Sequence, residues 1–124
     1  MEPEAILTNL KGKVKGAIAA AWLGLKGEIL ACPPEVLPGE TAHFLADLSS
    51  TAQGFNLGGV RLVLVEQEGG SYILTPLRDG SYLILVLNQG AWIGQAIFEL
   101  RKTAFWWERR GMDRFKVQGS TFKE

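Results

Sequence analysis

The sequence predicts an α+β domain built on a five-stranded antiparallel sheet with helices covering both faces. Three runs rich in β-branched, aromatic and leucine residues lie close together, at Val60–Val65, Ser71–Leu77 and Ser81–Leu87. The turn signals Gly69-Gly70 and Asp79-Gly80 separate them, because glycine supplies the positive φ angles of tight hairpin turns. The first and third runs carry apolar residues on both sides of the strand instead of alternating apolar with polar residues, so both faces of this meander must be covered.

Length and charge exclude several classes of protein. The chain has 124 residues, which favours one domain, and its formal net charge is zero, which argues against nucleic acid as a partner. The single cysteine, Cys32, excludes an intramolecular disulfide and fits a reducing compartment. The acidic start lacks the basic region of a signal peptide, and the longest apolar run, Ala17–Leu25, is about half a membrane span. We therefore expect a cytoplasmic protein with no stable membrane insertion.

The first part of the chain predicts a helix followed by a hairpin. Glu4–Lys15 has apolar residues at spacings of three and four, lysines near its end, and Gly16 after it. The run Ala17–Leu23 is ambiguous, because alanine favours helix. The flanking glycines and the second short apolar run at Glu28–Cys32 favour a hairpin.

The second predicted helix, Glu40–Phe55, has three distinct faces when its residues are placed at steps of 100°. The core face carries Thr41, Phe44, Leu45, Leu48, Ala52 and Phe55. A neighbouring stripe of mostly small residues comprises Ala42, Ala46, Ser49 and Gln53. The remaining arc carries His43, Asp47 and Ser50. This small-residue stripe either allows another helix to approach closely or is simply the solvent-exposed side of the helix. The pattern alone supports both interpretations.

The last predicted helix covers Ala91–Ala104, with Trp92, Ala96 and Leu100 four residues apart along one face. The helix continues to about Arg110, and beyond Gly111 the chain is either a short extra strand or a tail. We therefore divide the chain into a domain at residues 1–104 and a C-terminal extension at 105–124.

The extension opens with Trp106-Trp107 followed by Arg109-Arg110. These residues either dock on a partner or an anionic membrane surface, or the tryptophans close the core beneath the last helix; the second interpretation is favoured. The predicted order is helix, two strands, helix, three strands, helix. Two helices should cover one face of the sheet, and the second helix should lie alone on the other.

Catalytic and cofactor chemistry finds little support in the sequence. A Cys–His pair would have to use Cys32 and His43, but Cys32 ends an apolar run beside two prolines and His43 lies on a helix surface. Metal ligands are not concentrated anywhere, and the glycines at 54, 58 and 59 do not form a phosphate-binding loop. We therefore predict no catalytic residues, no metal and no cofactor.

Several segments, in this order and spacing, resemble the Roadblock/dynein-light-chain domain family in its bacterial MglB-like branch. The family's opening helix and hairpin are similar to Leu7–Leu10, Val14–Ala19 and Leu25–Ala31. Its central meander is similar to Arg61–Leu87, and the start of its last helix to Gly90–Gly94. The resemblance spans about residues 4–104 and leaves the extension outside it.

The resemblance implies a profilin-like/roadblock sandwich and a non-enzymatic, partner-binding protein. Such domains form homodimers in which the strand after the second helix pairs with its symmetry mate and the second helices lie side by side. Members often bind Ras-like small GTPases, and MglB-type members stimulate GTP hydrolysis by remodelling the GTPase.

On this chain the resemblance places a dimer interface at Ala42, Ala46, Ser49, Gln53, Val60, Leu62 and Leu64. The partner-binding residues would be His43, Asp47 and Ser50. The alternative function is a structural light-chain-like subunit that joins other proteins regardless of nucleotide.

Overall fold

The computed structural model describes residues 3–31, 43–45, 47–48 and 61–109. It confirms the predicted α+β class with a five-stranded antiparallel sheet. In chain order the elements are α1 (Pro3–Lys13), β1 (Ala17–Leu23), β2 (Ile29–Ala31), β3 (Val63–Gln67), β4 (Gly70–Pro76), β5 (Tyr82–Asn88) and α3 (Ile93–Arg109). Residues 43–45 and 47–48 are also helical and are called the middle helical segment here.

The strand order in the sheet is β2-β1-β5-β4-β3. The hairpin β1–β2 therefore joins the meander through β5, with Ala21 opposite Ile84 and Leu23 opposite Tyr82. Because β1 takes the free side of β5, β3 lies at the edge of the sheet formed by the described strands. An edge position is what the resemblance implied for a strand that pairs with its symmetry mate.

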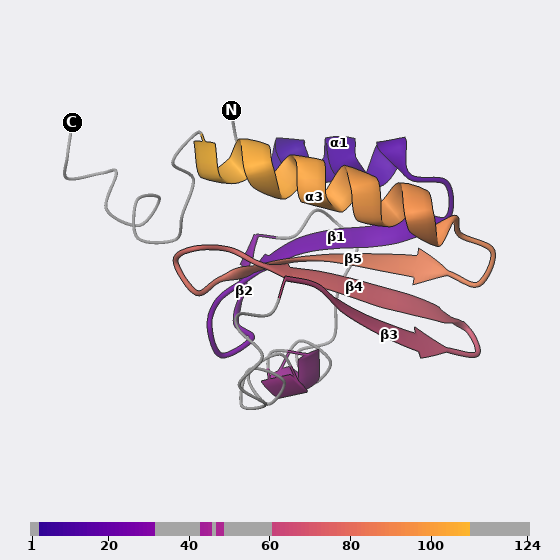
Figure 1. Ribbon diagram of the computed structural model, residues 1–124, viewed down its shortest axis with the longest axis horizontal. Coiled ribbons are helices and arrows are strands. Elements are labelled where there is room, and N and C mark those ends of the chain that lie inside the picture. Colours follow the sequence, from indigo (N-terminus) through magenta and orange to yellow (C-terminus); the bar gives the residue numbers. More distant parts are fainter. Residues whose placement is uncertain (1–2, 32–42, 46, 49–60, 110–124) are drawn as a thin grey trace.

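Two layers of helix cover the two faces. Figure 1 shows α1 and α3 side by side on one face, and the middle helical segment on the other. This is the predicted arrangement of two helices on one face and one on the other.

Each face of the sheet has its own core. The core beneath α1 and α3 includes Leu7, Leu10, Trp22, Ile73, Leu83, Leu85, Leu100 and Trp107. The core on the opposite face comprises Ala21, Leu23, Leu45, Leu74, Tyr82 and Ile84. Alternate residues of the central strands thus enter different cores, which explains why these strands are apolar throughout.

Two tryptophans close the core under the end of α3. Trp107 and Trp22 are both 1% exposed and meet edge to face, with ring centroids 5.1 Å apart. The Trp22 Nε1–H donates a hydrogen bond of 3.0 Å to Ser81 Oγ, and the Ser81 hydroxyl in turn donates to Asp79 Oδ1. This chain of bonds ties the centre of the sheet to the β4–β5 turn.

Several element boundaries differ from the predicted ones. α1 ends at Lys13 because the chain tightens there, where the Val14 N–H donates to the Lys11 carbonyl and Gly16 has a φ of 89°. The ambiguous alanine run is a strand, since β5 pairs along it. The third strand starts at Val63, and α3 starts at Ile93 rather than Ala91. The end of α3 at Arg109 agrees with the predicted continuation to about Arg110.

Within the described residues, no helix has the length and apolar character needed to cross a membrane.

Candidate interaction edge and helical platform

Strand β3 offers a regular, open sheet edge. In the described part of the chain only β4 pairs with it, through five consecutive residue pairs from Val63–Leu74 to Gln67–Gly70 without any register shift. The opposite edge is β2, which has three residues in the described part of the chain, and β1 changes register where β2 pairs with it. A long, unbulged edge is the one that templates a further strand, so β3 is the candidate for pairing.

Within the described part of the chain, the backbone of β3 has hydrogen-bonding groups that point away from β4. The two-residue turn at 68–69 makes Gln67–Gly70 the closing pair of the hairpin, and antiparallel pairs alternate between bonded and non-bonded. Val65 and Val63 therefore bond to β4, whereas the N–H and C=O of Leu64 and Glu66 point away from it. These outward groups are the ones a further strand would bind.

The side chains of this edge are mostly apolar. Leu64 lies opposite Ile73, on the face covered by α1 and α3, yet it is 39% exposed because α3 packs over β4 and β5. Val63 and Val65 lie on the other face and are partly buried against its core. In the strand itself the only charge is Glu66, so the edge has few of the charges that usually prevent pairing.

The structure places part of the predicted dimer interface. Leu64 lies in the edge strand, and Leu62 lies just before it, packed against the core under α1 and α3. The predicted interface residues outside the described part of the chain are Ala42, Ala46, Ser49, Gln53 and Val60. The assignment of these residues to an interface stays a prediction.

The middle helical segment presents a short exposed platform. Leu45 is fully buried against the sheet, whereas His43, Phe44 and Asp47 are exposed. His43 and Asp47 were predicted to face outward and do so. Ser50, the third predicted partner-binding residue, lies outside the described residues, as does Cys32.

Phe44 was wrongly predicted to lie in the core: it is 56% exposed. At 100° per residue, the buried direction lies between Leu45 and the half-buried Leu48, and Phe44 is displaced from it toward Asp47. The platform therefore places an aromatic ring beside an imidazole and a carboxylate. A broad apolar arc in the sequence gave no signal of which side would be left exposed.

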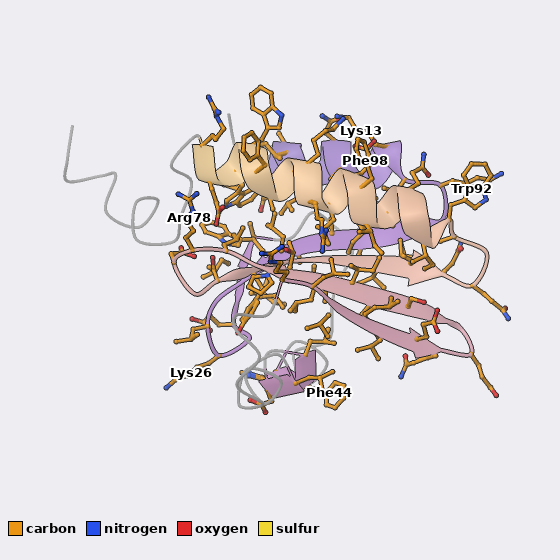
Figure 2. The ribbon with its side chains drawn as sticks, in the orientation of Figure 1. Lys13, Lys26, Phe44, Arg78, Trp92 and Phe98 are labelled. Atoms are coloured by element: carbon orange, nitrogen blue, oxygen red, sulfur yellow. The ribbon has the colours of Figure 1, made fainter. Side chains whose placement is uncertain are left out.

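His43 also has a structural contact. Its Nδ1 hydrogen-bonds to the carbonyl oxygen of Lys26 in the β1–β2 turn, so Nδ1 must be the protonated nitrogen. The bond holds the platform against the hairpin and leaves Nε2 as the ring nitrogen available to a partner. Figure 2 shows Phe44 and Lys26 on this side of the sheet.

Possible metal ligands and cavities lie among the described residues. No group of three or more possible metal ligands occurs among residues 3–31, 43–45, 47–48 and 61–109. A groove of about 380 Å³ lies between α1 and α3, lined by residues including Leu10, Lys13, Lys102 and Trp106. The described residues that line this groove combine apolar, aromatic and basic side chains.

Comparison with known proteins identifies the fold. No protein-family model and no curated protein sequence matches this chain. Among solved structures, a Roadblock/LC7 domain from Streptomyces avermitilis aligns with a TM-score of 0.72 at 18% identity, over 91% of this chain and all of that one. MglC from Myxococcus xanthus aligns with a TM-score of 0.61 at 25% identity, over 81% of this chain and 91% of that one.

Two further structures extend the comparison. The gliding protein MglB from Thermus thermophilus aligns with a TM-score of 0.70 at 20% identity, over 81% of each chain. Profilin IB from Acanthamoeba castellanii aligns with a TM-score of 0.65 at 20% identity, over 89% of this chain and 99% of that one. The resemblance to Roadblock domains of the MglB type and the predicted profilin-like/roadblock sandwich are thus confirmed.

Proposed function

We propose that this Roadblock-fold chain is a non-enzymatic homodimer that acts as a regulator or scaffold and binds a Ras-like small GTPase. The observation that carries the proposal is the regular open edge at β3, on a fold whose solved examples include MglB and MglC.

The edge geometry supports self-pairing in particular. A two-fold axis normal to the sheet would bring one β3 antiparallel to its mate, so that the outward groups of Leu64 and Glu66 meet those of the second copy. Leu64 of each copy would then meet the other subunit and lose its contact with water. One solved MglB structure of the same fold has a tetrameric arrangement, which is consistent with association of such chains.

Dimerisation would place two platforms on the same face of one continuous sheet. On each subunit, Phe44 supplies an apolar contact, and His43 and Asp47 supply a hydrogen-bonding ring and a carboxylate. Interfaces that form reversibly combine an aromatic anchor with a polar rim in this way. The predicted small-residue stripe around Ala46 belongs between the two second helices.

The dimer is tested by changing the edge backbone at one residue. Leu64→Pro removes an outward N–H without breaking a bond to β4, whereas Leu64→Thr keeps this N–H and introduces a β-branched side chain that suits a strand. Each symmetric dimer loses two bonds, and each unpaired group costs about 1–3 kcal/mol, so Leu64→Pro should weaken association by about 2–6 kcal/mol. Light scattering across a concentration series measures this loss.

We expect the unmodified protein to have twice the mass of its 13.6 kDa chain. Leu64→Thr should remain dimeric where Leu64→Pro is monomeric. A monomeric unmodified protein at micromolar concentration, or a fully dimeric Leu64→Pro variant, would remove the basis for pairing through β3.

Partner binding is tested with a Ras-like GTPase of the same organism, loaded with GDP or with a non-hydrolysable GTP analogue. Asp47→Arg should abolish binding, while Glu4→Arg, the same charge change on the opposite face, should not. Both variants should remain dimers. If Asp47→Arg binds the GTPase as tightly as the unmodified protein does, the platform is not the binding site. Equal affinity for the GDP-loaded and GTP-analogue-loaded GTPase would favour the structural light-chain-like alternative.

A further inference from the structure

The solvent-facing side of α3 carries alternating aromatic and basic residues. Phe98, Lys102, Phe105 and Arg109 recur at i, i+4, i+7 and i+11, so they form one continuous stripe along the helix. The stripe lies opposite the buried side of α3, and its two rings are 62% and 58% exposed. We call these four residues the α3 stripe.

Each ring of the α3 stripe lies beneath a cation. The Lys102 Nζ is 5.3 Å from the centroid of the Phe98 ring, and the Arg109 Cζ is 5.3 Å from that of Phe105. These contacts hold positive charge and aromatic surface together at the outermost layer of the molecule. Lysine and arginine stems cover part of the rings while their charged groups stay in water.

The carboxylates of α3 offset only part of the positive charge of the stripe. Glu99 is only 15% exposed at its side chain and pairs with Lys102 at 3.6 Å. Glu108 lies on the flank of the helix, 3.7 Å from the Arg78 guanidinium, and also accepts the Arg78 backbone N–H. The exposed charge along the stripe is therefore positive.

The helix layer as a whole is basic although the chain is neutral. Its helices α1 and α3 carry the cations Lys11, Lys13, Arg101, Lys102 and Arg109 and the anions Glu4, Glu99 and Glu108. Beside them, Lys15 lies over the Trp92 ring at 5.3 Å, and Trp106 is 52% exposed at the groove between the helices. Figure 2 shows Lys13, Phe98 and Trp92 together on this side of the molecule.

We propose that the α3 stripe docks this protein reversibly on an anionic phospholipid surface. α1 and α3 together form the outer layer on this face of the sheet (Figure 1), so the solvent-facing side of α3 can meet a planar bilayer. Aromatic rings favour the interfacial region of a bilayer, and each Lys or Arg near it is attracted to anionic headgroups. The stripe is a ridge rather than a pocket, which favours a lipid surface over an acidic peptide.

The platform and the α3 stripe lie on opposite faces of the sheet, so docking of the stripe determines where the platform points. Phe44 lies on the far side of the sheet from Phe98 (Figure 2), so a membrane-bound subunit would turn its platform toward the solution. If the proposed β3 dimer forms, both α3 stripes face the same bilayer, and the second contact follows the first at high effective concentration. Only this simultaneous contact of two α3 stripes rests on the proposed function.

Vesicle sedimentation tests the proposal with full-length protein. The two probes are vesicles of phosphatidylcholine alone and vesicles of phosphatidylcholine mixed with phosphatidylglycerol, each at low and high ionic strength. The unmodified protein should sediment with the mixed vesicles only, and high salt should release it. The double variant Phe98→Ser/Lys102→Gln should lower partitioning about tenfold or more, since one lysine alone is worth about fivefold.

The matched control is Phe44→Ser/Lys26→Gln, which removes one exposed phenylalanine and one lysine from the other face. It should bind mixed vesicles as the unmodified protein does. Both double variants change exposed side chains, so circular dichroism should confirm that they remain folded. Three results would each overturn the proposal: equal binding to both vesicle types, no binding to mixed vesicles, or unchanged binding by Phe98→Ser/Lys102→Gln. If the protein does not bind mixed vesicles, an acidic protein becomes the partner to test.

Discussion

The paired tryptophans allow a sharp test of the core, because the same substitution can be made at two touching sites. Trp22→Phe and Trp107→Phe remove the same atoms from side chains that are both 1% exposed, so their cavity costs nearly cancel in a comparison. The two indoles differ in one respect. The Trp22 N–H donates to Ser81 Oγ, whereas the Trp107 N–H has no acceptor within the described part of the chain.

This difference in hydrogen bonding should give the two variants different free energies of unfolding. Trp22→Phe loses a buried hydrogen bond worth about 0.5–1.5 kcal/mol, while Trp107→Phe removes an unsatisfied donor whose burial costs about 1–3 kcal/mol. Trp22→Phe should therefore have the lower free energy of unfolding, by roughly 1.5–4.5 kcal/mol.

Urea unfolding followed by far-ultraviolet circular dichroism measures the gap. With a slope of about 2 kcal/mol per molar, the midpoint of Trp22→Phe should lie about 1–2 M below that of Trp107→Phe. Both variants must be compared at one protein concentration, because dimerisation would contribute to stability. Equal midpoints, or a lower midpoint for Trp107→Phe, would refute the assignment of the hydrogen bonds in this core.

Two further pairs of variants test the sheet and the middle helical segment. A Cβ on Gly70 would lie 2.1 Å from the Leu87 carbonyl oxygen, whereas one on Gly69 meets nothing within 4 Å, so Gly70→Ala should lower the thermal midpoint by several degrees more than Gly69→Ala. Similar midpoints would argue against the close approach of β4 and β5 there. Leu45→Ala should cost about 2–5 kcal/mol in urea unfolding, and Phe44→Ala less than about 0.5 kcal/mol. A larger loss of stability from Phe44→Ala than from Leu45→Ala would indicate that Phe44 lies in the core.

The sheet was predictable from the sequence because its strands are short, apolar and separated by turn glycines. The meander and the hairpin were recovered with small boundary errors, and even the edge position of β3 followed once the resemblance was recognised. The alanine run Ala17–Leu23 shows the limit of propensity: alanine favours helix, yet pairing with β5 makes the run a strand. Such tertiary pairing is not encoded in any local pattern.

The surface residues were harder to predict, because neighbours on a helix differ by 100° in direction. In the pair Trp106-Trp107, one indole is exposed and the other fills the core, although the sequence shows two identical residues. The favoured interpretation, that both tryptophans close the core, is correct for Trp107 and wrong for Trp106. Phe44 and Leu45 divide in the same way. An apolar pair on a helix fixes which face is buried only when the packing of its neighbours is known.

The position of β1 beside β5 also decides the order in which the molecule can assemble. Trp22 and Ser81, joined by a hydrogen bond at the centre of the fold, are 59 positions apart in the chain. Closing so long a loop is entropically costly, whereas β3, β4 and β5 meet their neighbours through short turns. On the ribosome, α1 and the first hairpin therefore emerge long before β5, the strand that completes their core, has been synthesised. Until then their apolar residues are open to non-native contacts, and the N-terminal quarter of the chain is where we expect chaperones to bind during synthesis.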